Sequence, residues 1–150
     1  MVRKAVVTGI GIISSLGDNA KEVLTSLKEC KSGISYSEEY AEKGFRSHVY
    51  GMPKIDLNDA LDRKNKRFMG DGAAYNYLSM EEAITDSGLS EEQVSHERTG
   101  LIMGSGGPST RNLIQAADTA RERGPKKVGP FMVPRTMSST NSATLATPFK

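Results

Sequence analysis

The sequence predicts an α/β layered fold built from two strand-to-helix units. Residues 4–13, "KAVVTGIGII", and residues 99–107, "TGLIMGSGG", are nearly continuous apolar runs that contain or end in glycines. Such runs are typical of strands buried on both faces of a sheet, and each precedes a helical pattern. Long, mostly helical connections between the two strands favour helices layered on a sheet.

The first unit predicts a strand, a loop and a helix. Asn19 and Glu22 have the spacing of an N-cap residue and its N3 partner, and apolar residues then recur at helical spacing before Gly33. Residues 34–53 lack a clear period, so we expect irregular structure there. Within them, "SHVYG" at positions 47–51 has the composition of a short strand.

The connection between the two units contains one long amphipathic helix over residues 62–88. Its front end is basic, apolar side chains follow at positions 73, 77, 80 and 84, and Gly88 stands where a C-cap belongs. Residues 110–123 predict another helix, and residues 126–139 predict a proline-punctuated loop. The small residues of "SATLATPFK" predict a tightly packed last helix that Pro148 should end.

Composition indicates a globular protein of one domain. The chain has 150 residues, of which 37% are hydrophobic and 25% are charged. This apolar content is enough to form a buried core, so we do not expect disorder. The formal net charge of +2 is small, and an acidic partner would need a local basic patch. The single cysteine excludes an internal disulfide and favours a reducing compartment. With no signal-peptide pattern and no apolar stretch near the roughly 20 residues that span a bilayer, we expect a soluble, cytoplasmic protein.

Candidate nucleophiles and ligands are few. Cys30 falls near the carboxyl end of the first expected helix, where the negative end of the dipole disfavours a thiolate, so we interpret it as a structural thiol. Neither His48 nor His96 has a second ligand at metal spacing. The residues therefore predict no catalytic set and no metal site.

Two glycine motifs have different interpretations. "TGIGIISSLG" departs from G-x-G-x-x-G at Ser14, and its helix begins too late to lie under a pyrophosphate, so a tight turn is favoured over a nucleotide site. "GSGGPST", residues 104–110, leads almost directly into a helix but lacks the G-K-[ST] of a P-loop. It favours close approach of the backbone to a substrate or to a neighbouring segment.

Cationic residues gather in two places. They are Arg63, Lys64, Lys66 and Arg67 in the first cluster, and Arg121, Arg123, Lys126 and Lys127 in the second. Cations at a helix start oppose the helix dipole, so the first cluster fits either a solvated face or a docking site for an acidic protein. Nucleic acid is disfavoured because no aromatic residues interleave with the cations.

Several segments together resemble a known family. "KAVVTGIGIISSLG", "KSGI", "FRSHVYG", "DRKNKRFM", "GLIMGSGG" and "GPFMVPRTMSSTNSATLATPFK" resemble, in order and over essentially the whole chain, the amino-terminal part of bacterial 3-oxoacyl-[acyl-carrier-protein] synthase I. These are condensing enzymes of type II fatty-acid synthesis. The resemblance implies a thiolase-like fold, layered α/β/α/β/α, of which residues 1–150 form most of the first half and the carboxy-terminal half is absent.

The resemblance also implies an activity. In the family, a cysteine thiolate takes an acyl group from acyl carrier protein, and the enolate formed by decarboxylation of malonyl carrier protein attacks it, with two histidines stabilising the enolate oxygen. These residues and a lysine follow Lys150 in the family, so we assign no catalytic residue and expect the 150-residue chain alone to be inactive. We expect a homodimer without cofactor, metal, nucleic acid or membrane partner. The alternatives are a nucleotide-binding α/β domain and a stand-alone module that binds an acidic protein.

The resemblance assigns roles to two groups of residues. Carrier-protein binding falls on Arg63, Lys64, Arg67, Lys126 and Lys127, and the acyl pocket falls on Gly106, Gly107, Thr136 and Met137. The last two lie where the family places residues of the dimer interface that line the acyl chain.

Overall fold

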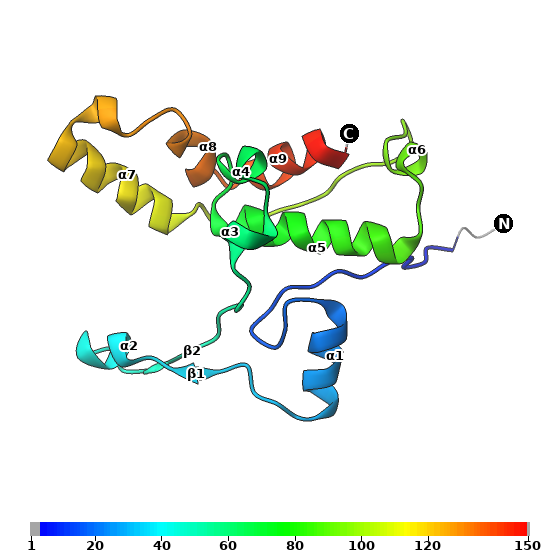
Figure 1. Ribbon diagram of the computed structural model, residues 1–150, viewed down its shortest axis with the longest axis horizontal. Helices are drawn as coiled ribbons and strands as arrows, with labels where there is room; N and C mark the ends of the chain where they lie inside the picture. The colour runs from blue at the N-terminus through cyan, green and yellow to red at the C-terminus, as the bar shows by residue number, and fades with distance from the viewer. Residues whose placement is uncertain (1–3, 150) are drawn as a thin grey trace. The chain divides into compact units, whose positions relative to one another are not determined.

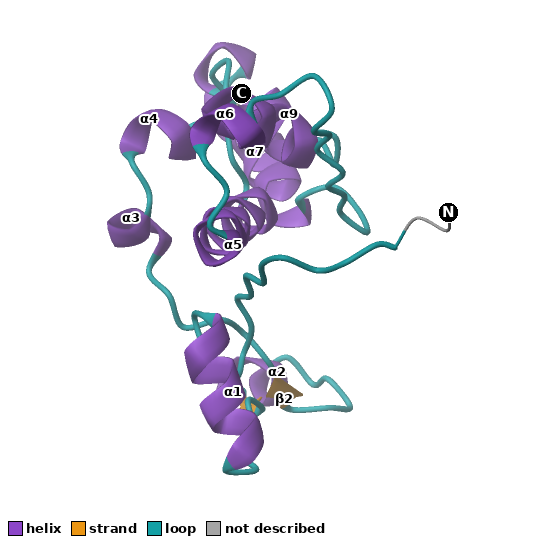
Figure 2. Cartoon of the chain, turned by 90° about the vertical axis from the view of Figure 1, so that its right-hand side faces the viewer, coloured by secondary structure: helices purple, strands orange, loops and turns teal. Residues whose placement is uncertain are grey.

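The computed structural model describes residues 4–149, and they divide into two compact units. Unit 1 holds the described residues up to Ile55 together with Ser79–Gly88, and unit 2 holds Asp56–Leu78 together with the described residues from Leu89 onwards. Regular structure in both is mainly helical, and Figure 2 shows the strands as short orange segments.

The elements follow one another along the chain as labelled in Figure 1. Unit 1 contains α1 (Ala20–Lys28), β1 (Ser35–Tyr36), α2 (Glu38–Glu42), β2 (Val49–Tyr50) and the later part of α5 (Asp71–Ser87). Unit 2 contains the first part of α5, together with α3 (Leu57–Ala60), α4 (Arg63–Lys66), α6 (Glu91–Val94), α7 (Thr110–Arg123), the 3₁₀ helix η1 (Pro125–Lys127), α8 (Met132–Thr136) and α9 (Thr140–Phe149).

Local signals are confirmed at the start of α1 and the end of α5. The Asn19 side chain accepts a hydrogen bond from the Glu22 N–H at 2.9 Å, as the N-cap prediction requires. The Glu22 carboxylate accepts in turn from the Asp18 N–H, and this bond, together with a hydrogen bond between the Asn19 side chain and the same carboxylate, lowers the pKa of Glu22. Gly88 has a φ of +66°, the left-handed conformation expected of a glycine C-cap.

The predicted strand in "SHVYG" is also confirmed. β2 pairs with β1 in an antiparallel ribbon in which Ser35 lies opposite Tyr50. Around this ribbon, Tyr40 packs against Phe45 and Tyr50, with ring centroids 5.1 Å and 6.1 Å apart. Aromatic contacts of this kind stabilise a ribbon that is too short to be stable by its ladder alone.

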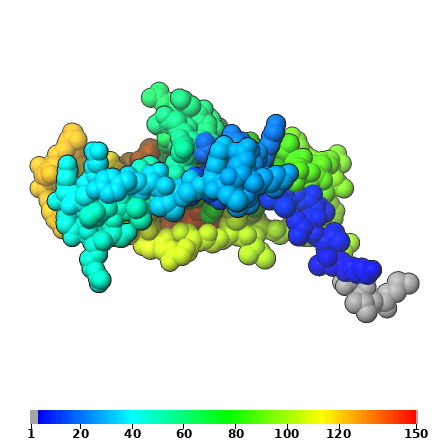
Figure 3. Space-filling model, turned by 90° about the horizontal axis from the view of Figure 1, so that it is seen from below, coloured from blue at the N-terminus to red at the C-terminus, as the bar shows by residue number. Residues whose placement is uncertain are grey.

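The predicted buried strand at residues 4–13 is wrong. The segment is extended but unpaired, its Val6 side chain is 79% exposed, and Figure 3 shows the segment in dark blue at the surface. The N–H groups of Ile10 and Ile12 donate to the carboxylates of Asp86 and Glu82, each at 2.9 Å. Side chains of α5 thus take backbone bonds that a neighbouring strand would otherwise supply.

The tight turn predicted around Gly9 and Gly11 is replaced by close packing against α5. A Cβ atom on Gly9 would lie 2.1 Å from the Ala83 carbonyl oxygen, and one on Gly11 would lie 1.8 Å from the Ser79 carbonyl oxygen. Only glycine permits that approach. The turn itself lies further along, where Ser14 and Gly17 form an isolated bridge.

The second predicted strand, residues 99–107, is also wrong. No strand is assigned there, and Ile102 is 95% exposed. A strand buried on both faces needs a neighbour on at least one edge and cover on both faces. The described residues of unit 2 supply helices but no strand to pair with it.

The predicted helix over residues 62–88 is broken into α4 and α5. Arg135 Nε donates to the Arg67 carbonyl oxygen at 2.9 Å, and a Cβ on Gly70 would lie 2.9 Å from the Arg135 carbonyl oxygen. Arg135 thus binds or crowds the backbone at both Arg67 and Gly70, between α4 and α5. The continuous helix that the sequence predicts is interrupted there. The predicted loop at 126–139 likewise contains helical turns, in η1 and α8.

The last helix is confirmed, but Pro148 does not end it. Helix α9 continues to Phe149, whose ring stacks on Tyr77 with centroids 5.2 Å apart. This contact holds the final turn in place although Pro148 lacks an N–H. Tight packing of the helix is confirmed at Leu145, which is fully buried.

The core of unit 2 gathers around the turn between α4 and α5. Its buried apolar side chains are Leu57, Leu61, Met69, Ala73, Ala74 and Leu145. They come from α3, α5, α9 and the segments between them, so the basic front of α4 is attached to a packed base.

Replacing Glu82 should destabilise unit 1. Its carboxylate accepts from the N–H groups of Ile12 and Ala20, at 2.9 Å and 2.8 Å. Because hydrogen bonds to charged groups contribute more than neutral ones, we expect Glu82→Ala to lower the free energy of unfolding by about 2 kcal/mol in the protein made from its complete gene. Denaturant titration would measure this. Glu81→Ala, at an exposed neighbouring position, is the control, and equal losses in both variants would contradict the assignment.

Candidate functional site

A cavity of about 220 Å³ lies in unit 2 between the glycine loop, the start of α7 and the segment that leads into α9. Here we call residues 104–107 the glycine loop. Two of the four residues assigned to acyl binding, Gly107 and Met137, line this cavity together. They are 30 positions apart in the sequence, so only the fold brings them to one site.

The other two assigned residues lie beside the cavity without lining it. Gly106 is exposed in the glycine loop. The Thr136 hydroxyl donates to the Val133 carbonyl oxygen at 2.8 Å, within the last turn of α8. Gly106 and Thr136 are therefore neighbours of the cavity and do not form part of its wall.

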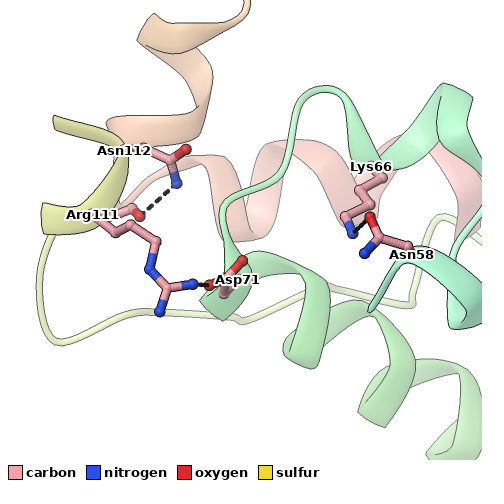
Figure 4. A network of polar contacts seen from close by, with 6 residues as sticks. Asn58, Lys66, Asp71, Arg111 and Asn112 are labelled. Atoms are coloured by element: carbon pink, nitrogen blue, oxygen red, sulfur yellow. Dashed lines mark hydrogen bonds and ion pairs between the residues drawn. The ribbon is translucent and has the colours of Figure 1, made fainter. Parts of the chain in front are cut away.

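Polar contacts brace the mouth of the cavity. Arg111 at the start of α7 pairs with Asp71 at the start of α5, with an N–O distance of 2.8 Å (Figure 4). Asn112 is buried, and its Nδ2 donates to the Ser109 hydroxyl at 2.8 Å. The first contact joins two helix starts beside the glycine loop. The lining of the cavity combines glycine, methionine, hydroxyl and amide groups with two arginines, Arg111 and Arg135. Such a lining can bind and orient a chain, and it contains neither a cysteine nor a histidine.

Asparagines on α5 and α9 form a further contact that the sequence did not predict. Asn76 Nδ2 donates to Asn141 Oδ1 at 2.7 Å, and Asn141 lines the cavity. The residues are 65 positions apart, so no local pattern connects them.

The first basic cluster lies on α4 and the turn after it. Arg63, Lys64 and Arg67 are exposed, and no ion pair is found for them within residues 4–149. The Arg67 guanidinium lies over two aromatic rings, 4.8 Å from the Phe68 centroid and 5.3 Å from the Phe131 centroid. Cation–π contacts of this kind hold the side chain in one orientation while leaving its charge exposed.

Lys66 in the same cluster has a different environment. Its Nζ donates to Asn58 Oδ1 at 2.6 Å, as Figure 4 shows. It is therefore tied to α3, whereas its neighbours face outward. The composition of the cluster did not separate Lys66 from its neighbours, although the residues that the resemblance assigns to carrier-protein binding do not include it.

The basic face continues into a second cavity of about 410 Å³. Lys64 and Arg67 line it together with Phe68, Met69 and residues of α9. Exposed cations thus stand beside an apolar hollow within unit 2.

The second basic cluster lies at the end of α7 and in η1. Lys126 and Lys127 are exposed, while Arg121 pairs with Asp118 at 3.1 Å. Within residues 4–149, no hydrogen bond or ion pair joins these lysines to the first cluster.

The remaining candidates have ordinary environments. Cys30 follows the C-cap of α1, as predicted, but it is exposed, with a φ of +54°, so it does not pack in a core. The His48 ring packs edge-on against Tyr36, and His96 Nδ1 accepts from the Arg98 N–H at 3.1 Å. Across residues 4–149, no three His, Cys, Asp or Glu side chains gather closely enough to hold a metal ion.

Within residues 4–149, no helix is both long enough and apolar enough to cross a membrane.

Known proteins resemble this chain over nearly its whole length. Residues 3–150 match the family "Beta-ketoacyl synthase, N-terminal domain". The chain is 54% identical to 3-oxoacyl-[acyl-carrier-protein] synthase 1 of Haemophilus influenzae and 52% identical to that of Escherichia coli, in each case over 99% of this chain and 37% of the relative. The chain thus spans little more than a third of these proteins.

A solved structure shows the same path of the backbone. A beta-ketoacyl synthase from Burkholderia phymatum matches with a TM-score of 0.76 and 25% identity, over 96% of this chain and 36% of that protein. The comparisons confirm the thiolase-like fold and do not favour the nucleotide-binding or stand-alone alternatives. The chain belongs to the beta-ketoacyl synthase family, within its amino-terminal domain.

Proposed function

We propose that this chain is part of a condensing enzyme of type II fatty-acid synthesis, which elongates acyl carrier protein thioesters with malonyl carrier protein by decarboxylative Claisen condensation. The observation that carries the proposal is the 54% identity, over 99% of the chain, to a protein named 3-oxoacyl-[acyl-carrier-protein] synthase 1. The cavity that Gly107 and Met137 share supports a role for this chain in acyl binding.

The chemistry proposed for the whole enzyme divides into two covalent steps. A cysteine thiolate attacks the acyl thioester and releases the carrier thiol. Malonyl carrier protein then loses carbon dioxide, and the resulting enolate carbon attacks the enzyme-bound acyl group and releases the thiolate. In this chain, Cys30, His48 and His96 lie in separate environments and form no catalytic set. We therefore propose that its residues bind and orient the substrate.

In this proposal the acyl chain lies against the glycine loop. Gly106 and Gly107 carry no side chain, so a methylene chain can approach their backbone closely. Met137 supplies the opposite wall, with Thr136 beside it, and we propose that they do so within a homodimer. A cytoplasmic location agrees with the use of one exposed cysteine and no disulfide.

The carrier protein is proposed to dock on the exposed cations. Arg63, Lys64 and Arg67 form the first contact, and Lys126 and Lys127 form a second. Exposed charges without ion pairs attract an acidic partner over a distance comparable with the Debye length, about 8 Å at physiological salt. Their main effect is therefore on the rate of association.

Charge reversal tests this docking face. In the protein made from its complete gene, Arg63→Glu with Lys64→Glu should weaken binding of acyl carrier protein at least about tenfold at low salt, and the loss should shrink as salt rises. Surface plasmon resonance at several salt concentrations would measure both.

The control variant is Lys21→Glu with Lys54→Glu, which makes the same change of net charge at exposed positions of unit 1. Carrier-protein affinity that is unchanged at low salt in the first variant would show that Arg63 and Lys64 form only a solvated face.

A further inference from the structure

We infer that the Asn76–Asn141 amide pair is a positioning device that sets the separation of the two walls of the 220 Å³ cavity, and thereby the acyl-chain preference of the enzyme. The inference rests on the proposed function for its substrate. Its structural part, the fixing of the glycine loop, does not depend on that function.

The pair connects three segments of unit 2. The two N–H groups of the Asn76 amide serve two acceptors, Asn141 Oδ1 at 2.7 Å and the Gly104 carbonyl oxygen at 3.4 Å. Asn141 Nδ2 donates to the Ser138 carbonyl oxygen at 2.8 Å. Helix α5 is thereby joined to the glycine loop on one side and to the segment before α9 on the other.

Both ends of this connection lie next to the cavity walls. Gly104 opens the loop that contains Gly107, and Ser138 directly follows Met137. Any change in the two amides therefore moves the backbone on which each wall is built. Asn141 itself also lines the cavity.

The glycine loop has little else to hold it. Three of its four residues are glycines, which have no side chain to pack, and a Cβ added at any of those three would meet no atom within 4 Å. Ser105 is turned back on the loop, where its hydroxyl donates to the Gly107 carbonyl oxygen at 2.8 Å. A hydrogen bond from a neighbouring helix is thus the kind of contact that can give this loop a defined position.

The positions of Asn76 and Asn141 within helices also call for an explanation. Asparagine is an unfavourable residue inside a helix, yet Asn76 lies within α5 and Asn141 lies in the first turn of α9. Asn141 is only 4% exposed, so its amide would be costly without partners. Their mutual bond offsets that cost, and their remaining donors reach backbone on both sides of the cavity.

The preference for acyl chains of different length depends on the separation of the cavity walls. Each buried methylene changes affinity by about fourfold. A loop that shifts enough to admit or exclude one methylene would therefore change the ratio of activities toward long and short acyl chains by about that factor.

Two variants separate positioning from stability, both made in the protein expressed from its complete gene. Asn141→Leu takes one of the two acceptors away from the Asn76 amide and should lower Tm. Asn76→Leu with Asn141→Leu removes both amides and should recover much of that Tm, since replacing both polar partners leaves none unpaired. The single variant keeps the Asn76 bond to the Gly104 carbonyl oxygen and loses the bond to Ser138, whereas the double variant loses both.

The first readout is hydrogen exchange of residues 100–108, which needs no substrate. We expect faster exchange there in the double variant although it regains its Tm, because it has lost the bond to the Gly104 carbonyl oxygen. Asn112→Leu is the matched control, because it removes another buried asparagine amide of unit 2, whose side chain donates to Ser109, the N-cap residue of its own helix, and not to the glycine loop. It should lower Tm with a smaller change in exchange over residues 100–108.

The second readout is kcat/KM for short, medium and long acyl carrier protein substrates. The double variant should keep a changed long-to-short ratio, by about threefold or more, although its Tm recovers. A double variant with both the original exchange and the original ratio overturns the inference. If the unaltered protein elongates no acyl carrier protein, the proposed function fails, while faster exchange in the double variant still establishes the positioning of the loop.

Discussion

Residues 1–150 expressed by themselves should fail to form a stable monomer with a cooperative thermal transition. Large apolar side chains are exposed in both units, among them Val6 and Val7 in unit 1 and Ile102, Ile114 and Val133 in unit 2. Each Å² of apolar surface that remains in water forgoes about 25 cal/mol of stabilisation that burial would have given. A typical domain has only about 5 to 15 kcal/mol of net stability, so a few hundred Å² of missing burial is enough to remove it.

Calorimetry combined with sedimentation would test this expectation. We expect the polypeptide of residues 1–150 to aggregate or to unfold without a sharp transition, whereas the product of the complete gene should show one. The same comparison with Val6→Ser and Ile102→Ser should improve solubility of the short polypeptide without creating a transition. A monomer of residues 1–150 that unfolds cooperatively would contradict the prediction.

The second large effect concerns activity. Residues 1–150 alone should not condense acyl and malonyl groups, because within residues 4–149 the exposed Cys30 lies at the carboxyl end of α1 and neither histidine is part of a catalytic set. The dipole at that end of a helix disfavours a thiolate. The measurement is product formation from acyl and malonyl carrier protein, with the complete protein as the positive control.

A substitution in the complete protein makes the test independent of folding. Cys30→Ser should leave turnover and Tm unchanged, because the thiol is exposed. Loss of turnover with an unchanged Tm would instead identify Cys30 as a nucleophile. Elongation by the purified 150-residue chain would overturn the assignment just as directly.

Features that depend on neighbours in the sequence were predictable. The N-cap at Asn19, the C-cap at Gly88 and the short strand in "SHVYG" depend on contacts within a few residues, and the structure confirms all three. The same holds for the helix at residues 110–123, which is α7. Hydrogen bonds and side-chain periods of this range are visible in the order of the residues.

Features that need a distant partner were not predictable. The apolar runs at residues 4–13 and 99–107 have strand composition, but a strand also needs a neighbouring strand, and the carboxylates of Asp86 and Glu82 bind the first run instead. Likewise Arg135 breaks the expected long helix by binding the Arg67 carbonyl group. Composition states what a segment could form, and its partner decides what it does form.

The candidate site shows the same division. Sequence resemblance named Gly107 and Met137 separately, and the identity of the family followed from the order of motifs along the chain. Only the tertiary structure placed those two residues in one cavity and tied its walls through Asn76 and Asn141. The reason is that a hydrogen bond between side chains 65 positions apart depends on how two helices pack, and that packing is set by the whole fold and not by the residues beside either amide.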